Sequence, residues 1–231
     1  MMIKKIVSTA LLSLFGLTLV QSQNVCSKYY PMEEGTSFQL TTYDNKDKVT
    51  AIINYLVSET ALIGSSQRAT MATEIMDEEG TPMATSAYDI LCEDDAVSID
   101  FKSLMGPDMY SKFPEMDMEV SGTALHLPNN LEEGQMLPDA DMLAVVNISP
   151  IKMRMTFLMK NRKVEGKETV TTPAGSFDCI ILSYEYESKF GIKVSGMGKQ
   201  WLAEGVGLVQ QEDYNKKGKV MSKTILTRFG S

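Results

Sequence analysis

Polar and apolar residues alternate along most of the chain after residue 36, as expected of β-strands whose successive side chains point to opposite faces. In one short run, Val97, Ile99 and Phe101 alternate with Ser98 and Asp100. Such runs recur roughly every 10–15 residues and are separated by turn-forming stretches rich in Gly, Asn and Asp. The pattern predicts about 11–12 strands.

The clearest strand-like runs are residues 177–187, 192–203, 206–214 and 220–229, and turns of only a few residues join them. Short turns favour antiparallel neighbours, and no strand–helix–strand alternation indicates a parallel sheet. We therefore predict a mainly β fold, a curved antiparallel sheet that forms a barrel or a half-open barrel. Periodicity alone does not distinguish these two forms. Residues 24–231 are expected to form a single all-β domain.

The spacing of apolar residues changes between Ser103 and Met116. Leu104, Met105, Met109 and Phe113 are spaced more nearly as in a helix, and Pro107 suits a first helical turn. One short helical segment is predicted here, placed to close the curved sheet.

The N-terminus has the layout of a secretory signal peptide. Lys4 and Lys5 precede the uncharged apolar run Ile6–Val20, and a polar stretch follows. This run is shorter than the roughly 20 residues that cross a bilayer as a helix. We predict that residues 1–23 are a signal peptide cleaved near Ser22-Gln23. The mature chain would then be a soluble exported protein without a transmembrane segment, periplasmic or extracellular.

A lipid anchor on Cys26 is the alternative to free export. Lipidated cysteines usually follow a small residue and have an apolar residue three positions before them. Here the preceding residues are Gln23, Asn24 and Val25, which meet neither requirement. The sequence therefore favours a soluble protein over a tethered one.

The charge balance bears on possible partners. The chain has 30 acidic and 22 basic residues, and loss of Lys4 and Lys5 on cleavage would leave 20 basic ones, a net charge near −10. Nucleic-acid binding depends on clustered Lys and Arg. The only dense basic run, residues 216–219, is typical of a solvated turn. We therefore expect no nucleic-acid partner.

Cysteine chemistry leaves three possibilities open. The mature chain has Cys26, Cys92 and Cys179, and thiols outside the cytosol tend to pair. One structural disulfide is favoured, but three pairings are possible and the sequence does not choose among them. All three could instead be buried thiols. A catalytic thiol would need a nearby base, and the only histidine is His126.

Catalytic and cofactor motifs are not recognisable. The Gly-x-Ser-x-Gly motif of serine hydrolases does not occur. Gly196-Met197-Gly198 and Gly205-Val206-Gly207 do not open helices, so they are expected to allow bulges or sharp turns rather than to bind phosphates. Neighbouring acidic residues lie in turns, and a Ca²⁺ site at Asp139 and Asp141 would lack the regular ligand spacing of a dedicated loop. We expect no enzyme activity, no cofactor and no metal site.

Methionine is unusually frequent, with 17 residues. Thioethers bind Cu(I), but the chain has one histidine and no dense Met-x-Met array. Filling of an irregular core is the simpler interpretation. The other is an adaptable apolar cavity, because flexible and polarizable side chains suit apolar ligands. The candidate ligand-facing residues are Met105, Met109, Met153 and Met155.

Two segments carry a family resemblance: Val170–Cys179, with a Pro-Ala-Gly turn, and Trp201–Val209, with a Gly turn. Together with Cys26–Pro31 and Leu131–Gln135, they resemble the uncharacterised secreted bacterial proteins of the domain of unknown function 3108-like family. The resemblance implies a curved antiparallel sheet in the periplasm or cell envelope of Gram-negative bacteria. It implies no reaction and no catalytic residues. By fold analogy only, such a sheet is similar to lipocalin-like and lipoprotein-carrier half-barrels.

Two functional hypotheses follow. In the first, a non-enzymatic exported envelope protein holds a hydrophobic small molecule, lipid-like in character, or a segment of another envelope protein in its curved sheet. In the second, the interior is packed with side chains and the protein is structural or interacts through its surface, with no small-molecule ligand.

Overall fold

The fold of the chain was analysed in a computed structural model that describes residues 26–99, 118–148 and 151–230. Thirteen antiparallel strands make up this part of the chain, and it contains no helix, so the mainly β prediction is confirmed. The predicted signal peptide and the predicted helical segment lie outside the described residues. The strands are β1 (Ser37–Asp44), β2 (Val49–Ile63), β3 (Ser66–Met76), β4 (Pro82–Glu93), β5 (Ala96–Ile99), β6 (Met118–Thr123), β7 (Leu125–Pro128), β8 (Ala140–Ile148), β9 (Ile151–Thr172), β10 (Gly175–Phe190), β11 (Ile192–Ala203), β12 (Gly207–Asn215) and β13 (Val220–Gly230).

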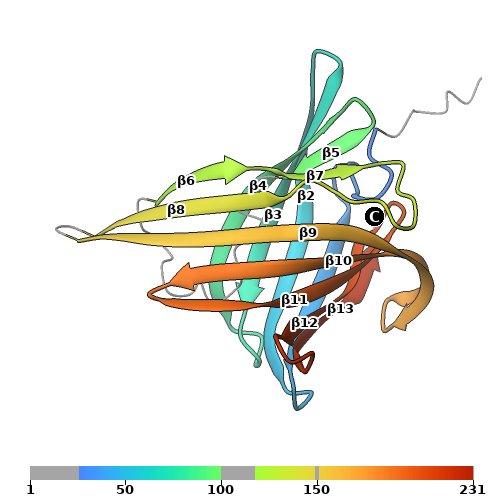
Figure 1. Ribbon diagram of the computed structural model, residues 1–231. Helices are drawn as coiled ribbons and strands as arrows, with labels where there is room; N and C mark the ends of the chain where they lie inside the picture. Colours follow the sequence, from blue (N-terminus) through green and yellow to red (C-terminus); the bar gives the residue numbers. More distant parts are fainter. Residues whose placement is uncertain (1–25, 100–117, 149–150, 231) are drawn as a thin grey trace, which may run out of the picture.

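All thirteen strands belong to one sheet, in the order β6-β8-β9-β10-β11-β12-β13-β1-β2-β3-β4-β5-β7. Strands that follow one another in the chain are neighbours from β8 to β13 and from β1 to β5, as a meander requires. The pairing of β13 with β1 joins the two runs, with Leu226 opposite Leu40. The sheet curls on itself, so that β8–β11 cross in front of β2–β4 in Figure 1.

Strands β6 and β7 nearly close this sheet into a barrel. Only Ala124 separates them, yet β6 pairs with β8 at one end of the sheet and β7 pairs with β5 at the other. One stretch of chain thus spans the opening. It leaves a single seam between β6 and β7, which are the two edge strands of the sheet. The prediction left a closed and a half-open barrel undecided, and the structure is a nearly closed barrel.

The seam is bridged by a side chain. Arg162 on β9 is only 3% exposed, and its Nη1 donates to the carbonyl oxygens of His126 on β7 (3.0 Å) and Pro138 before β8 (2.7 Å). The loop between β7 and β8 also runs along β9, with Leu137 N donating to Arg162 O at 2.8 Å. Side-chain and loop hydrogen bonds therefore replace a regular ladder here.

The central strand of the second half is β10, which lies between β9 and β11. Ile180, Leu182 and Tyr184 are buried on one of its faces, and Cys179 is buried on the other. The continuous apolar run in the sequence therefore reflects a strand covered on both sides. Burial of each large apolar side chain contributes about 1.5–3 kcal/mol relative to exposure.

Candidate functional site

A cavity of about 220 Å³ lies inside the barrel. Its wall comes from strands on both crossing faces of the sheet and from one N-terminal tyrosine. Most of the lining is aromatic or aliphatic, and a smaller part is amide or hydroxyl. The lining residues are Tyr30, Phe38, Leu40, Thr42, Ile53, Tyr55, Tyr88, Ile99, Leu125, Phe157, Met159, Tyr184, Gln200, Leu208, Gln211 and Thr224.

Stacked rings form part of the wall. Phe38 on β1 and Tyr55 on β2 pack with ring centroids 4.6 Å apart and nearly parallel planes. The lining residue Phe157 on β9 stacks at 6.3 Å on Tyr186 on β10, which is not itself part of the lining. Ring faces of this kind offer broad apolar contact with limited loss of side-chain entropy.

Four polar residues form a row across one side of the cavity. Thr42, Thr224, Gln211 and Gln200 lie on the adjacent strands β1, β13, β12 and β11, and each is directly opposite the next. The Oγ1 atoms of Thr42 and Thr224 are 2.9 Å apart, and Gln200 Nε2 donates to Gln211 Oε1 at 2.9 Å. We call these four residues the polar row. They give an otherwise apolar cavity a defined hydrogen-bonding side.

Asp213 lies two residues beyond the polar row on β12. Its carboxylate accepts hydrogen bonds from Ser222 Oγ (2.9 Å), Gln211 Nε2 (3.3 Å) and the Tyr184 hydroxyl. Burial raises the pKa of Asp213, and these hydrogen bonds oppose the shift. Burial also raises the pKa of Tyr184 well above its usual value. The Tyr184 hydroxyl therefore stays protonated and acts as a donor.

Two glycines make room for the tyrosine rings. Gly198 is opposite Tyr184 and Gly196 is opposite Tyr186 on the neighbouring strand. A Cβ at Gly198 would overlap the Tyr184 ring. The prediction that these two glycines allow a bulge or a sharp turn was wrong, because both lie inside β11, which pairs here without a register shift. Gly205 and Gly207, with φ of 71° and 85°, do form the predicted sharp turn.

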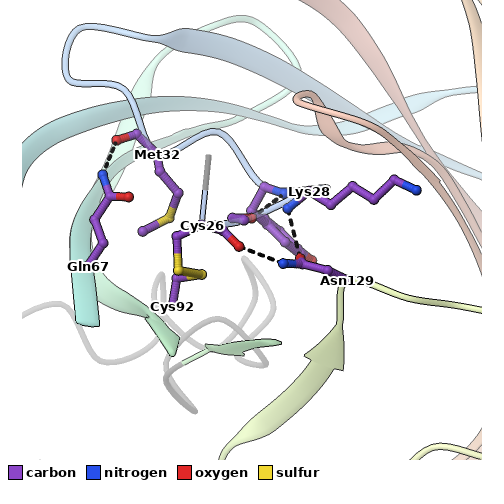
Figure 2. The surroundings of a disulfide bond; sticks show 8 residues. Cys26, Lys28, Met32, Gln67, Cys92 and Asn129 are labelled. Atoms are coloured by element: carbon purple, nitrogen blue, oxygen red, sulfur yellow. Dashed lines mark hydrogen bonds between the residues drawn. A yellow bond between two sulfur atoms is a disulfide. The ribbon is translucent and has the colours of Figure 1, made fainter. Parts of the chain in front are cut away.

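The N-terminal segment, residues 26–32, lies against the barrel and contributes Tyr30 to the cavity. Cys26 is joined to Cys92 on β4 by a disulfide (Figure 2). Asn129 also fixes this segment through two hydrogen bonds: its Nδ2 donates to Cys26 O at 2.6 Å, and its Oδ1 accepts from Lys28 N at 2.8 Å. The remaining thiol, Cys179, is buried, and burial raises its pKa to about 11, which is unlike a reactive thiolate.

The family model for DUF3108-like proteins matches residues 33–226, which is most of the chain and includes nearly the whole barrel. The chain belongs to the DUF3108-like family. This confirms the resemblance inferred from the sequence motifs. No curated protein matches the chain.

Two solved structures share the fold of this DUF3108-like protein. One is described as a proposed exported protein with a YmcC-like fold from Bacteroides fragilis, with a TM-score of 0.77 and 23% identity over 89% of this chain and 100% of that one. The other is described as a proposed lipoprotein from Parabacteroides distasonis, with a TM-score of 0.76 and 23% identity over 88% and 99% of the two chains. At this identity the likeness establishes the fold alone. Within the described ranges, no helix is long and apolar enough to span a membrane.

Of the four candidate ligand-facing methionines, only Met155 has a side chain within the described residues. Met155 is buried, with 2% exposure, but it is not among the residues that line the cavity, whereas Met159 four residues later is. Met105 and Met109 lie outside the described residues, as does the side chain of Met153. The ligand-facing role of these methionines stays a prediction.

Sequence reasoning did not identify the tyrosines and glutamines of the cavity. The available signal was the pairing of Tyr184-x-Tyr186 with Gly196-x-Gly198 across a predicted hairpin, since large rings next to glycines indicate space inside a barrel. Among the described residues, no group of three or more His, Cys, Asp or Glu side chains is arranged to hold a metal ion. The lining residues of the cavity supply apolar surface and hydrogen-bonding groups.

Proposed function

We propose that this DUF3108-like protein is a non-enzymatic, exported envelope protein whose barrel interior binds a small molecule with an apolar body and a polar end. The cavity carries the proposal. Aromatic and aliphatic side chains form most of its wall, and the polar row occupies one side. Ligand pockets in proteins commonly combine a largely apolar lining with a few placed polar groups.

The volume of the cavity limits the size of the ligand. At about 220 Å³ it is smaller than the roughly 300–1,000 Å³ typical of sites for drug-sized molecules. A short acyl chain or a single substituted ring suits this volume, whereas a complete two-chain lipid does not. Burial of eight carbons yields about 6 kcal/mol at ~0.8 kcal/mol per CH₂ before ordering costs, consistent with sub-millimolar binding.

Export is supported by two independent observations. The Cys26–Cys92 disulfide is typical of proteins that fold outside the cytosol. The two structural neighbours are described as an exported protein and a lipoprotein. Together with the predicted signal peptide, these favour a location in the cell envelope of a Gram-negative bacterium.

A packed structural protein is the second candidate. Much of the interior is filled with side chains, and Val57, Met71, Ile90 and Leu226 are completely buried. If these side chains also exclude ligands from the cavity, the surface alone is functional. Direct measurement of ligand entry separates the two candidates.

Octan-1-ol is a suitable first probe because it matches the cavity in size and carries no charge. In protein labelled at the methionine methyl groups, we expect octanol to shift the NMR signal of Met159, which lines the cavity, more than that of buried Met155. Leu208→Trp should fill the cavity and abolish the shift, whereas Leu62→Trp, at an exposed position near the end of β2, should not. No shift at saturating octanol would reject the binding proposal in favour of the packed one.

A further inference from the structure

Arg162 is a buried cation whose hydrogen bonds account for only part of its guanidinium group. The side chain is 3% exposed, and Nη1 donates to the carbonyls of His126 and Pro138. A guanidinium has five N–H donors. In the part of the chain that the structure describes, the three donors on Nε and Nη2 have no hydrogen-bond partner. The charge of Asp139 acts on Arg162, but no described carboxylate lies within ion-pair distance of the guanidinium. A buried charge in such surroundings is costly unless an anion compensates it.

The position of Arg162 connects it with the cavity. It follows the lining residue Met159 on β9 by three positions, and Asn161 between them has a positive φ of 52° that offsets the alternation of the strand. The Arg162 charge acts on Tyr30 and Tyr184, both of which line the cavity, and opposes the rise in pKa that burial causes in each. Arg162 itself is not part of the lining, but it interacts electrostatically with these two residues that are.

The acidic group that interacts with Tyr184 is already hydrogen-bonded. Asp213, on β12, accepts hydrogen bonds from Ser222, Gln211 and Tyr184. The hydroxyl of Tyr30 has no hydrogen-bond partner in the described ranges. The Arg162 side of the cavity therefore offers unused donors, whereas the Asp213 side does not offer an unused negative charge.

We propose that Arg162, with the Tyr30 hydroxyl, binds the anionic head of the cavity ligand, so that the ligand is a short-chain monocarboxylate rather than a neutral molecule of the same size. Small movements of the tyrosine rings would bring the carboxylate to the guanidinium, whose Nε and Nη2 would donate to its two oxygens in a fork geometry. The apolar tail then lies along the Phe157 and Phe38 side of the cavity. This proposal rests on the proposed function, because it assumes that the cavity admits a ligand.

The test compares octanoate with octan-1-ol on the wild-type protein at pH 7.5 and 0.15 M salt, where long-range repulsion by the acidic protein is screened within about 8 Å. The two probes have the same chain and differ in head-group charge. We expect octanoate to bind at least about tenfold more tightly, as charge-assisted hydrogen bonds to a buried group provide. If neither octanoate nor octan-1-ol binds, the proposed function itself is wrong. If the two probes bind equally tightly, only the proposed role of Arg162 is wrong.

Arg162→Met should abolish the preference for octanoate while octanol binding is retained, and Arg154→Met, at an exposed position on the same strand, should change neither. A folded Arg162→Met variant that still prefers octanoate contradicts the proposal. Because Arg162 also bridges the seam, this variant could fail to fold. The side-chain Nε–H signal of Arg162 in the wild-type protein then decides: it should shift with octanoate and not with octanol, and no shift with octanoate rejects the assignment.

Discussion

The regular wall of the barrel and its seam hold together in different ways. From β8 through β13 and from β1 to β5, every strand pairs with its neighbour along an antiparallel ladder, so the backbone groups satisfy one another. At the seam the ladder is divided between β6 and β7, and side chains take over: Arg162 binds two carbonyls and Asn129 binds the N-terminal segment. A barrel closed in this way depends on a few identifiable residues at one place and on many interchangeable contacts elsewhere.

This comparison predicts where the protein is vulnerable. Substitutions on the regular wall should lower the free energy of unfolding only by the amount expected for the buried area removed, because the backbone ladder persists without any one side chain. Substitutions at the seam should lower the free energy of unfolding by more than their buried area suggests, because each removes a hydrogen bond or cross-link that the backbone ladder does not replace.

The largest effect is expected for the disulfide. Cys26 and Cys92 are separated by 66 residues, and a cross-link of this length stabilises a fold by about 4 kcal/mol through the entropy of the unfolded chain. The double variant Cys26→Ala/Cys92→Ala should lower the free energy of unfolding by roughly that amount in urea titrations. Cys179→Ala, which removes a buried thiol without a cross-link, is the matched control and should cost less. Equal losses in the two variants would show that the disulfide does not hold the N-terminal segment to the barrel.

The next effect is expected at Arg162. Arg162→Met leaves the carbonyls of His126 and Pro138 without their donor, and each hydrogen bond to a charged group contributes about 1.5–3 kcal/mol. Relief of the buried charge offsets part of this loss, so we expect a net destabilisation of about 2–4 kcal/mol by chemical denaturation. Hydrogen exchange should become faster in β7 and in the loop before β8, and not in β1–β3. Faster exchange spread evenly over the sheet would contradict a local role at the seam.

The sequence predicted the regular wall well and the seam poorly. Alternation in runs such as residues 192–203 and 220–229 reports directly on strands with one buried face, so β11 and β13 lie where they were expected. The run Met118–Leu127 also has strand-like alternation, but local pattern does not reveal that its two halves pair with opposite ends of the sheet. That division depends on contacts far apart in the sequence, which is also why the structure has more strands than the 11–12 predicted.

The candidate site was predicted less well than the fold for a related reason. Methionine clusters drew attention because of composition, whereas the cavity wall is assembled from single residues on many strands. Thr42, Thr224, Gln211 and Gln200 are more than 150 residues apart at their extremes, and only the closing of β13 onto β1 brings them into one row. Likewise, the burial of Arg162 follows from the seam and not from its neighbours in the sequence, which are polar.

The smallest expected effect concerns Asp213, which belongs to the regular wall but faces the interior. Its pKa is raised by burial, so the folded protein retains the Asp213 proton at pH values where the unfolded chain, with a pKa near 3.9, has lost it. The contribution of Asp213 to stability is therefore fully present below about pH 4 and is lost as the pH rises through the folded-state pKa. Asp213→Asn does not titrate. The stability of the wild type relative to this variant should thus decline as the pH rises from 4 and then level off, with other carboxylates cancelling in the difference. Urea unfolding of both proteins between pH 4 and 8 measures this difference in the free energy of unfolding. If the wild type instead gains stability relative to the variant as the pH rises, hydrogen bonds from Ser222, Gln211 and Tyr184 outweigh the effect of burial on this carboxylate.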